Sequence, residues 1–163
     1  MNADDVFRYG HLTILGAADG FPAAHWETPG ACGVWSAKDV LAHLASYELA
    51  TADVFAGILG EEPSPTLGLM LSRGAAFNDS QVEERRGQTA AETLAEYTQA
   101  HERAAELLAR IPHEQRRQIG ILPWYGVEYD LEDLITYMSY GHKREHGAQI
   151  AECRNRFGVA EAT

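Results

Sequence analysis

Apolar side chains recur every three or four residues along most of the chain, which is the period of an amphipathic helix. The clearest run follows Ser36 and consists of Val40, Leu44, Tyr47, Thr51, Val54 and Ile58. Ser36 and Asp39 form a capping-box pattern, in which each side chain accepts a hydrogen bond from the backbone amide of the other residue. The pattern therefore predicts a helix from about residue 36 to Gly60, ended by the turn Pro63-Ser64-Pro65.

Three further amphipathic patterns predict helices elsewhere. Thr89 and Glu92 open one that stops at Pro112, and its buried face is formed by Leu94, Tyr97, Ala104, Leu108 and Ile111. Asp130 and Asp133 open another that ends near 157–158, with a buried face of Leu131, Ile135, Met138, Gln149 and Cys153. A less regular pattern predicts an opening helix over about 4–17, with Val6, Tyr9, Leu12 and Leu15 facing inward.

The segments between these helices, 18–35, 60–88 and 112–129, are irregular in pattern. The second leaves room for a short helix around Phe77 and Val82. None of the three contains an alternating run long enough to predict a sheet. Four amphipathic helices without strands predict an all-α fold, a four-helix bundle with at least one long crossover connection, formed by a single domain over residues 1–163.

Composition narrows the classes of partner. The chain has 24 acidic and 13 basic residues, a net charge of −11, which disfavours binding to nucleic acid or to anionic membranes. No stretch approaches the roughly 18 apolar residues of a membrane span, and we expect a cytoplasmic protein. Cys32 and Cys153 are too few for a disulfide framework, so we expect reduced, partly buried thiols.

The candidate chemistry lies in the histidines. His142 and His146 are four residues apart, so their rings lie about 40° apart around a helix axis, on the side that continues the apolar stripe. His43 lies on the inward side of the helix that begins at residue 36. Buried imidazoles are costly unless their nitrogens are satisfied, and three histidine ligands are typical of an open catalytic metal site. The alternative is that each is a core histidine bonded to backbone.

Other polar residues allow more than one role. Glu145 gives the string from His142 to His146 the form of an inverted zinc-peptidase motif. We assign it either to proton transfer at the edge of the pocket or to a surface salt bridge. His101 continues an apolar stripe without a partner on its own helix, which predicts a pocket wall or a satisfied core residue more than a fourth ligand. We expect exposed side chains at His11, His25 and His113.

Two segments resemble the DinB/YfiT-like family of metal-dependent four-helix-bundle proteins. One runs from Trp35 to Leu44 with Glu48 after it, and the other runs from Gly141 through Glu145-His146 to Ile150. The part between them, from Phe77-Asn78 through Glu84-Arg85-Arg86 into the Thr89 helix, is similar to the branch that includes ClbS/DfsB-type proteins and mycothiol-dependent maleylpyruvate isomerases. The resemblance covers residues 30–157.

The resemblance implies a bundle with a metal on His43, His142 and His146, and branches that act as thiol-dependent transferases, isomerases or self-resistance proteins. Our leading hypothesis is an enzyme in which a divalent transition metal (Zn, Ni, Fe or Mn) activates water or a low-molecular-weight thiol toward a small electrophile. We expect Tyr47, Trp124 and Tyr125 to line its pocket. The alternatives are a non-catalytic binding or self-protection protein and a bundle with a vestigial site. The segment 67–71 predicts either a homodimer surface or a cap on the core.

Overall fold

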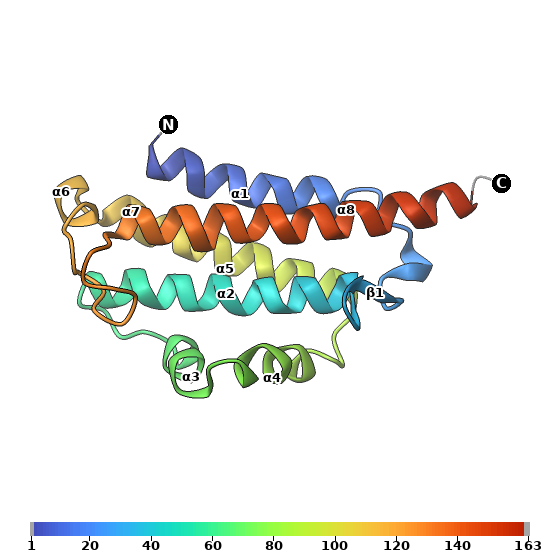
Figure 1. Cartoon of the computed structure of the whole chain (residues 1–163), viewed down its shortest axis with the longest axis horizontal. Coiled ribbons are helices and arrows are strands. Elements are labelled where there is room, and N and C mark those ends of the chain that lie inside the picture. The colour runs from blue at the N-terminus through green and yellow to red at the C-terminus, as the bar shows by residue number, and fades with distance from the viewer. Residues whose placement is uncertain (1, 162–163) are drawn as a thin grey trace.

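Four long helices pack side by side in the computed structural model, which describes residues 2–161 and side chains as far as residue 158 (Figure 1). They are α1 (Ala3–Ala18), α2 (Ala37–Ile58), α5 (Ala90–Arg110) and a fourth that runs without a break from α7 (Leu131–Leu134) through the π-helical segment η2 (Ile135–Gly141) into α8 (His142–Glu161). The predicted all-α four-helix bundle is confirmed.

The direction of the helices explains the long crossover. Figure 1 shows α1 and the α7–η2–α8 helix running one way along the bundle, and α2 and α5 running the other way. Because α2 and α5 are parallel, the chain has to return along the bundle between them. It does so through α3 (Thr66–Arg73) and α4 (Ala76–Glu84), which pack against α2. The sequence pattern predicted one short helix in this crossover, and the structure has two.

The two end connections are shorter. Between α1 and α2 the chain forms a 3-10 turn, η1 (Ala23–His25), and two antiparallel strands, β1 (Pro29–Cys32) and β2 (Trp35–Ser36). The prediction that no strands form was wrong here, because strands of two and four residues are too short to show alternation. Between α5 and α7 the chain forms the single turn α6 (His113–Arg116) and a loop.

The helix starts agree with the sequence patterns. The backbone amide of Asp39 donates to Ser36 Oγ (3.1 Å) and that of Ser36 donates to Asp39 Oδ2 (2.9 Å), which completes the predicted capping box of α2. Capping boxes are also present at Thr89 with Glu92 and at Asp130 with Asp133. Local hydrogen bonding therefore decides where three of the four long helices begin.

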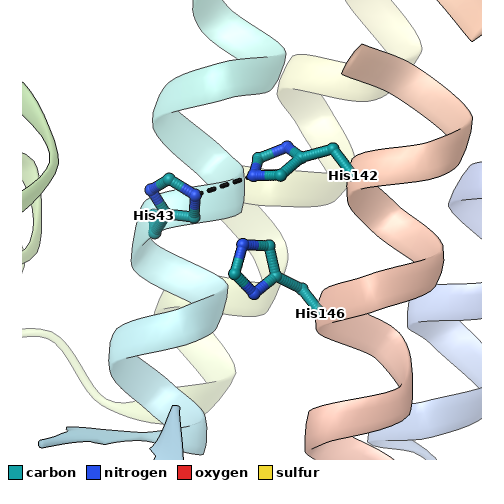
Figure 2. Close-up of side chains that lie close together, drawn as sticks. All are labelled: His43, His142 and His146. Atoms are coloured by element: carbon teal, nitrogen blue, oxygen red, sulfur yellow. Dashed lines mark hydrogen bonds between the residues drawn. The ribbon is translucent and has the colours of Figure 1, made fainter. Parts of the chain in front are cut away.

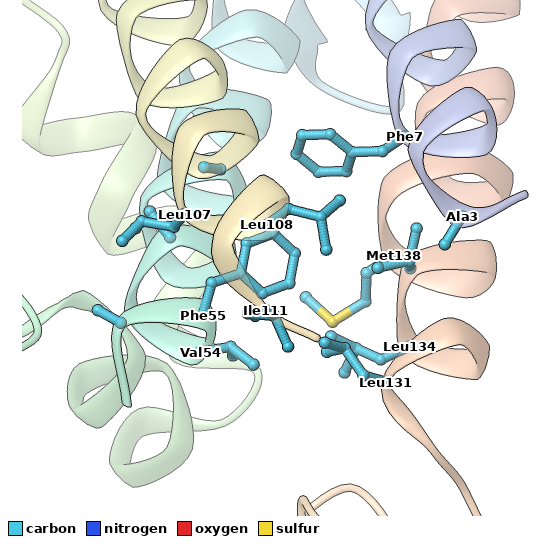
Figure 3. Packing of buried hydrophobic residues seen from close by; sticks show 14 of the residues in the cluster. Ala3, Phe7, Val54, Phe55, Leu107, Leu108, Ile111, Leu131, Leu134 and Met138 are labelled. Carbon is cyan, nitrogen blue, oxygen red and sulfur yellow. The ribbon is translucent and has the colours of Figure 1, made fainter. Parts of the chain in front are cut away.

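The apolar core consists of two clusters at opposite ends of the bundle. One surrounds Phe7, Phe55 and Leu108, and Figure 3 shows all four long helices contributing to it. Leu67 and Met70 of α3 pack against this cluster, which favours the capping role of that segment; the homodimer stays a prediction. The other cluster contains Ile14, Leu41, Leu44, Tyr97 and Ile150.

The inward face of α1 differs from the predicted one. Its buried positions include Phe7, Gly10, His11 and Ile14, whereas Tyr9 and Leu12 are 42% and 44% exposed. Gly10 explains the rotation, because a Cβ atom there would lie 1.9 Å from the carbonyl oxygen of Ser139. The helix turns its smallest residue toward η2, so that the two backbones approach closely.

Two smaller findings concern the membrane and the cysteines. Within residues 2–161, no helix is both long enough and apolar enough to cross a bilayer. Cys32 and Cys153 are free thiols, the first half-buried and the second buried.

Candidate metal centre

Three histidines converge between α2 and α8. His43 projects from α2, and His142 and His146 project from α8 toward it (Figure 2). One ring nitrogen from each lies within 4.8 Å of the others, and the Nε2 atoms of His43 and His142 are 2.9 Å apart. His43 and His146 are buried and His142 is half-buried. The structure thus brings together the three histidines, henceforth the triad, that the sequence placed on inward faces.

The π-helical segment determines which residues of α8 face the bundle. η2 ends at Gly141, so His142 is the first residue after it. A π-helical turn holds more residues than an α-helical one, which rotates everything that follows relative to the stripe begun by Leu131, and such segments are frequent at functional sites. From His142 onward the helix is regular, and the four-residue spacing keeps His142 and His146 on one side.

Hydrogen bonding to a side chain outside the triad orients one of the three rings. Nδ1 of His146 donates to Oε1 of Gln149 at 2.7 Å, so that Nε2 is the ring nitrogen left for the triad. Nδ1 of His43 and Nδ1 of His142 are buried, and neither has a hydrogen-bond partner within the part of the chain that the structure describes. Their Nε2 atoms, 2.9 Å apart, are hydrogen-bonded to each other (Figure 2), so these two rings are oriented by packing and by this mutual contact.

Burial keeps His43 and His142 neutral. Desolvation, with the neighbouring imidazoles His142 and His146, lowers the pKa of His43 to about 2. Desolvation and then His146 lower the pKa of His142 to about 4. Neutral imidazole is the form that binds a metal ion, so these rings need not release protons near pH 7 to do so. Three imidazole nitrogens that converge on one point are suitable ligands for zinc, nickel, iron and similar divalent ions.

Aromatic side chains surround the triad on the side of the crossover. The ring of Tyr47 lies 4.6 Å from those of both His43 and His142, centroid to centroid. Trp35 lies 5.2 Å from His43, and Phe77 of α4 lies 6.2 Å from Tyr47. The hydroxyl of Tyr47 donates to Oδ1 of Asn78 at 3.2 Å. Burial raises the pKa of Tyr47, so its hydroxyl stays protonated.

The other predicted site residues lie elsewhere. Trp124 and Tyr125 contact each other in the loop before α7, and Trp124 lines a cavity of about 370 Å³ to which none of the triad contributes. Glu145 lies on α8 with its side chain exposed. His101 is buried and bonded to a carboxylate. Of the predicted pocket residues, Tyr47 is the one that contacts the triad, and the roles assigned to the others stay predictions.

Sequence reasoning missed a layer of buried polar side chains between the two apolar clusters. Each long helix contributes one member, and we call the four residues His11, Glu48, His101 and Lys143 the polar layer. Nζ of Lys143 lies 2.7 Å from Oε1 of Glu48, and Nδ1 of His101 donates to Oε2 of Glu48 at 2.8 Å. His11 stacks on His101 with ring centroids 3.9 Å apart. Glu48 and Lys143 are each only 1% exposed.

The charges of this layer balance internally. Burial acts to raise the pKa of Glu48, but Lys143 and His101 hold it well below its usual value. Burial lowers the pKa of Lys143, and Glu48 opposes that effect. Burial, then His101, lowers the pKa of His11 to about 4. Glu48 is therefore a carboxylate with both oxygens engaged.

One sequence signal could have revealed the layer. Glu48 follows Leu44 by four residues within an apolar stripe. A charged residue in such a position has to be paired. The expectation that His11 is exposed was wrong, since it is 9% exposed, because Gly10 turns this side of α1 inward.

Comparison with known proteins gives one match. No curated protein and no solved structure matches the chain. The family model described as the mycothiol maleylpyruvate isomerase N-terminal domain matches residues 8–130, which cover α1 to α6 and include His43. The match confirms the DinB/YfiT-like resemblance, while His142 and His146 lie beyond the matched residues. Because the model covers more than half of the chain, the protein belongs to the mycothiol maleylpyruvate isomerase N-terminal domain family.

Proposed function

We propose that the protein is a metal-dependent enzyme in which water or a low-molecular-weight thiol reacts with a small electrophile, as in a hydrolase or a thiol-dependent transferase or isomerase. The observation that carries the proposal is the triad, whose three imidazoles converge with one ring nitrogen of each within 4.8 Å of the others. His43, His142 and His146 would hold the ion. A divalent metal in such a site lowers the pKa of a water or thiol bound to it and so supplies a nucleophile near neutral pH.

The chain's own residues would bind and orient the electrophile. Trp35, Tyr47 and Phe77 supply apolar surface beside the triad, and such surface excludes water and favours an uncharged or weakly polar molecule. The Tyr47 hydroxyl donates its hydrogen to Asn78, so its oxygen would accept a hydrogen bond from that molecule. The family description names mycothiol, which favours a thiol-dependent isomerase or transferase over a hydrolase.

A second candidate is a binding or self-protection protein with little turnover. The burial of the triad favours it, since His43 and His146 are 3% and 8% exposed and a substrate would reach the centre past His142. Both candidates need the metal, so they differ in turnover alone.

Metal content tests both candidates together. We would purify the protein without a histidine tag and measure metals by elemental analysis, beside His142→Ala and the control His113→Ala, whose histidine is exposed. We expect about one metal per chain in the wild type and the control and none in His142→Ala. Absence of metal from all three proteins would end the proposal.

Turnover then separates the two candidates. The metal-loaded protein is incubated with an epoxide or a maleyl compound, with and without a low-molecular-weight thiol. An enzyme gives several equivalents of product, and it loses this activity in His142→Ala. Product limited to one equivalent, or binding without product, would identify the binding protein instead.

A further inference from the structure

The polar layer joins the same two helices that carry the triad. Glu48 lies on α2 five residues after His43, and Lys143 lies on α8 directly after His142. The ion pair between them, 2.7 Å from Nζ to Oε1, is thus made within about one helical turn of two of the triad's members. A shift of α8 along or around its axis would stretch this pair and move His142 together with it.

A buried ion pair is weak evidence for stability by itself. Desolvating a carboxylate and an ammonium offsets much of their attraction, and an apolar pair of similar volume is often at least as stable. Glu48 and Lys143 are both 1% exposed, so this desolvation is close to complete. A role other than stability has to account for a charged pair at this place, and fixing the register between packed helices is the best-attested use of such groups.

Apolar packing alone does not orient this part of α8. Between Gly141 and Gln149 the helix carries no large apolar side chain, and its small residues there are Gly147 and Ala148. The π-helical segment η2 ends at Gly141, and the extra residue in its turn changes which positions of the following helix face inward. Bulky apolar side chains therefore do not set the rotation of the helix here. Gly147 limits its approach to Thr13 and Ile14 of α1, and the directional contact toward α2 is the ion pair of Lys143 with Glu48.

Glu48 is suited to provide that contact because it cannot easily move. Its second oxygen accepts a hydrogen bond from His101 at 2.8 Å, and His101 is stacked between His11 (3.9 Å) and Phe7 (4.5 Å). These rings come from α1 and α5, so the carboxylate is held by the two helices that do not carry the triad. Lys143 then reaches a point that is fixed relative to the whole bundle.

We propose that Glu48 and Lys143 are positioning residues, whose ion pair sets the rotation of α8 against α2 so that His142 and His146 face His43. The inference rests on the metal site of the proposed function. Neither residue touches the metal or the substrate in this scheme. Both act through the histidines.

A double-mutant cycle read out as metal affinity tests the inference. Glu48→Gln, Lys143→Met and the double variant are compared with the wild type, all without tags, by competition for Zn²⁺ with a chromogenic chelator. We expect each single variant to lose about 10- to 100-fold in affinity, the range seen when groups that orient metal ligands are removed. The double variant should lose no more than the worse single variant, since both substitutions remove one contact. Its melting temperature should exceed that of the single variants, because no charge is left unpaired.

A matched control separates positioning from general destabilisation. Arg116 is buried and pairs with Asp4 at 2.9 Å, at the end of the bundle where α6 lies. Asp4→Asn should lower the melting temperature and leave Zn²⁺ affinity unchanged. Wild-type affinity in both single variants would overturn the inference, as would a loss in Asp4→Asn equal to theirs or a recovery of affinity in the double variant. If the wild type and His142→Ala bind Zn²⁺ equally poorly, the proposed function fails as well, which distinguishes the two failures.

Discussion

The triad and the polar layer are two groups of buried polar side chains on neighbouring turns, and they differ in how they are satisfied. In the polar layer, both oxygens of Glu48 have partners within the chain, at 2.7 and 2.8 Å. In the triad, Nε2 of His43 and Nε2 of His142 face each other. No carboxylate lies among the three rings in the part of the chain that the structure describes. A group that is satisfied internally stabilises one arrangement of the helices, whereas one that presents convergent lone pairs is suited to a ligand from outside.

This difference teaches that burial of polar residues does not by itself mark a functional site. Both groups are buried, and both contain histidines whose pKa is lowered to about 4, His11 in the layer and His142 in the triad. What separates them is the type of partner: His101 is bonded to a carboxylate, whereas the rings of the triad contact imidazoles, the aromatic ring of Tyr47 and the neutral amide of Gln149. Each prediction below changes one group directly, and its effect on the other group tests how closely the two are coupled.

The largest effect is expected for His43→Ala. It removes one of three ligands and the only one from α2, so we expect complete loss of bound metal and of any turnover, with the polar layer unchanged. Elemental analysis and the thiol-dependent assay measure both. Retention of a full equivalent of metal in this variant would show that the triad is not the site.

The next largest effect is expected for Glu48→Leu, which leaves the Lys143 ammonium buried without a counter-charge. Removing one partner of a buried pair typically lowers the free energy of unfolding by about 3–5 kcal/mol. Urea denaturation measures the loss. Adding Lys143→Met should restore most of it, and a failure of the second substitution to do so would mean that the pair is not the source of the effect.

The pH dependence of stability should report the buried neutral histidines of both groups, because the pKa of His11 in the polar layer is lowered to about 4 as well. With a chelator present, the unfolded chain binds protons at its histidines below about pH 6.5, whereas His43 and His142 stay neutral in the folded state down to about pH 2 and 4. The unfolded state therefore binds more protons, and each histidine lowers the free energy of unfolding by up to about 1.4 kcal/mol per pH unit as the pH falls through this window. Glu48, whose pKa is lowered, adds a further loss that begins only below its ordinary value near 4.5. Denaturation curves between pH 7 and 4 measure the slope, and a flat profile would contradict the burial of neutral histidines.

The smallest effect is expected for Gly10→Ala. The added Cβ would lie 1.9 Å from the Ser139 carbonyl oxygen, so α1 has to move away from η2, at a loss of about 1–3 kcal/mol in the free energy of unfolding. Gly16→Ala is the control, since a Cβ there meets nothing within 4 Å and alanine favours the helix. We expect metal binding to survive in Gly16→Ala. In Gly10→Ala the added Cβ also lies 3.2 Å from Cδ of Lys143, so metal affinity should fall together with stability. Equal stability of the two variants would contradict the close approach of α1 and η2.

The sequence predicted those features that depend on neighbouring residues. The capping boxes at Ser36, Thr89 and Asp130 are made by side chains three residues apart, and all three are present. The pairing of His142 with His146 depends on one helical turn. The crossover was predicted from the long gap between the second and third amphipathic patterns. The presence of two helices within it was not predicted.

Features that depend on contact between distant segments were not predictable in this way. The two partners of Glu48, His101 and Lys143, lie at least 53 residues from it in sequence, so no local pattern brings them together. The buried face of α1 was predicted wrongly because it is set by the close approach of Gly10 to the backbone of η2. Sequence periodicity carries no information about such an approach. The π-helical segment likewise leaves no mark on a 3.6-residue pattern.

The sequence by itself determined an all-α bundle, the beginnings of its helices and three histidines on inward faces, because these follow from local hydrogen bonding and helical periodicity. Only the tertiary structure decided that the three histidines converge on one point and that the side chains of the polar layer pair with one another. The physical reason is that periodicity sets the direction of a side chain relative to its own helix axis, whereas the rotation and register of one helix against another are set by close packing and by paired charges between them.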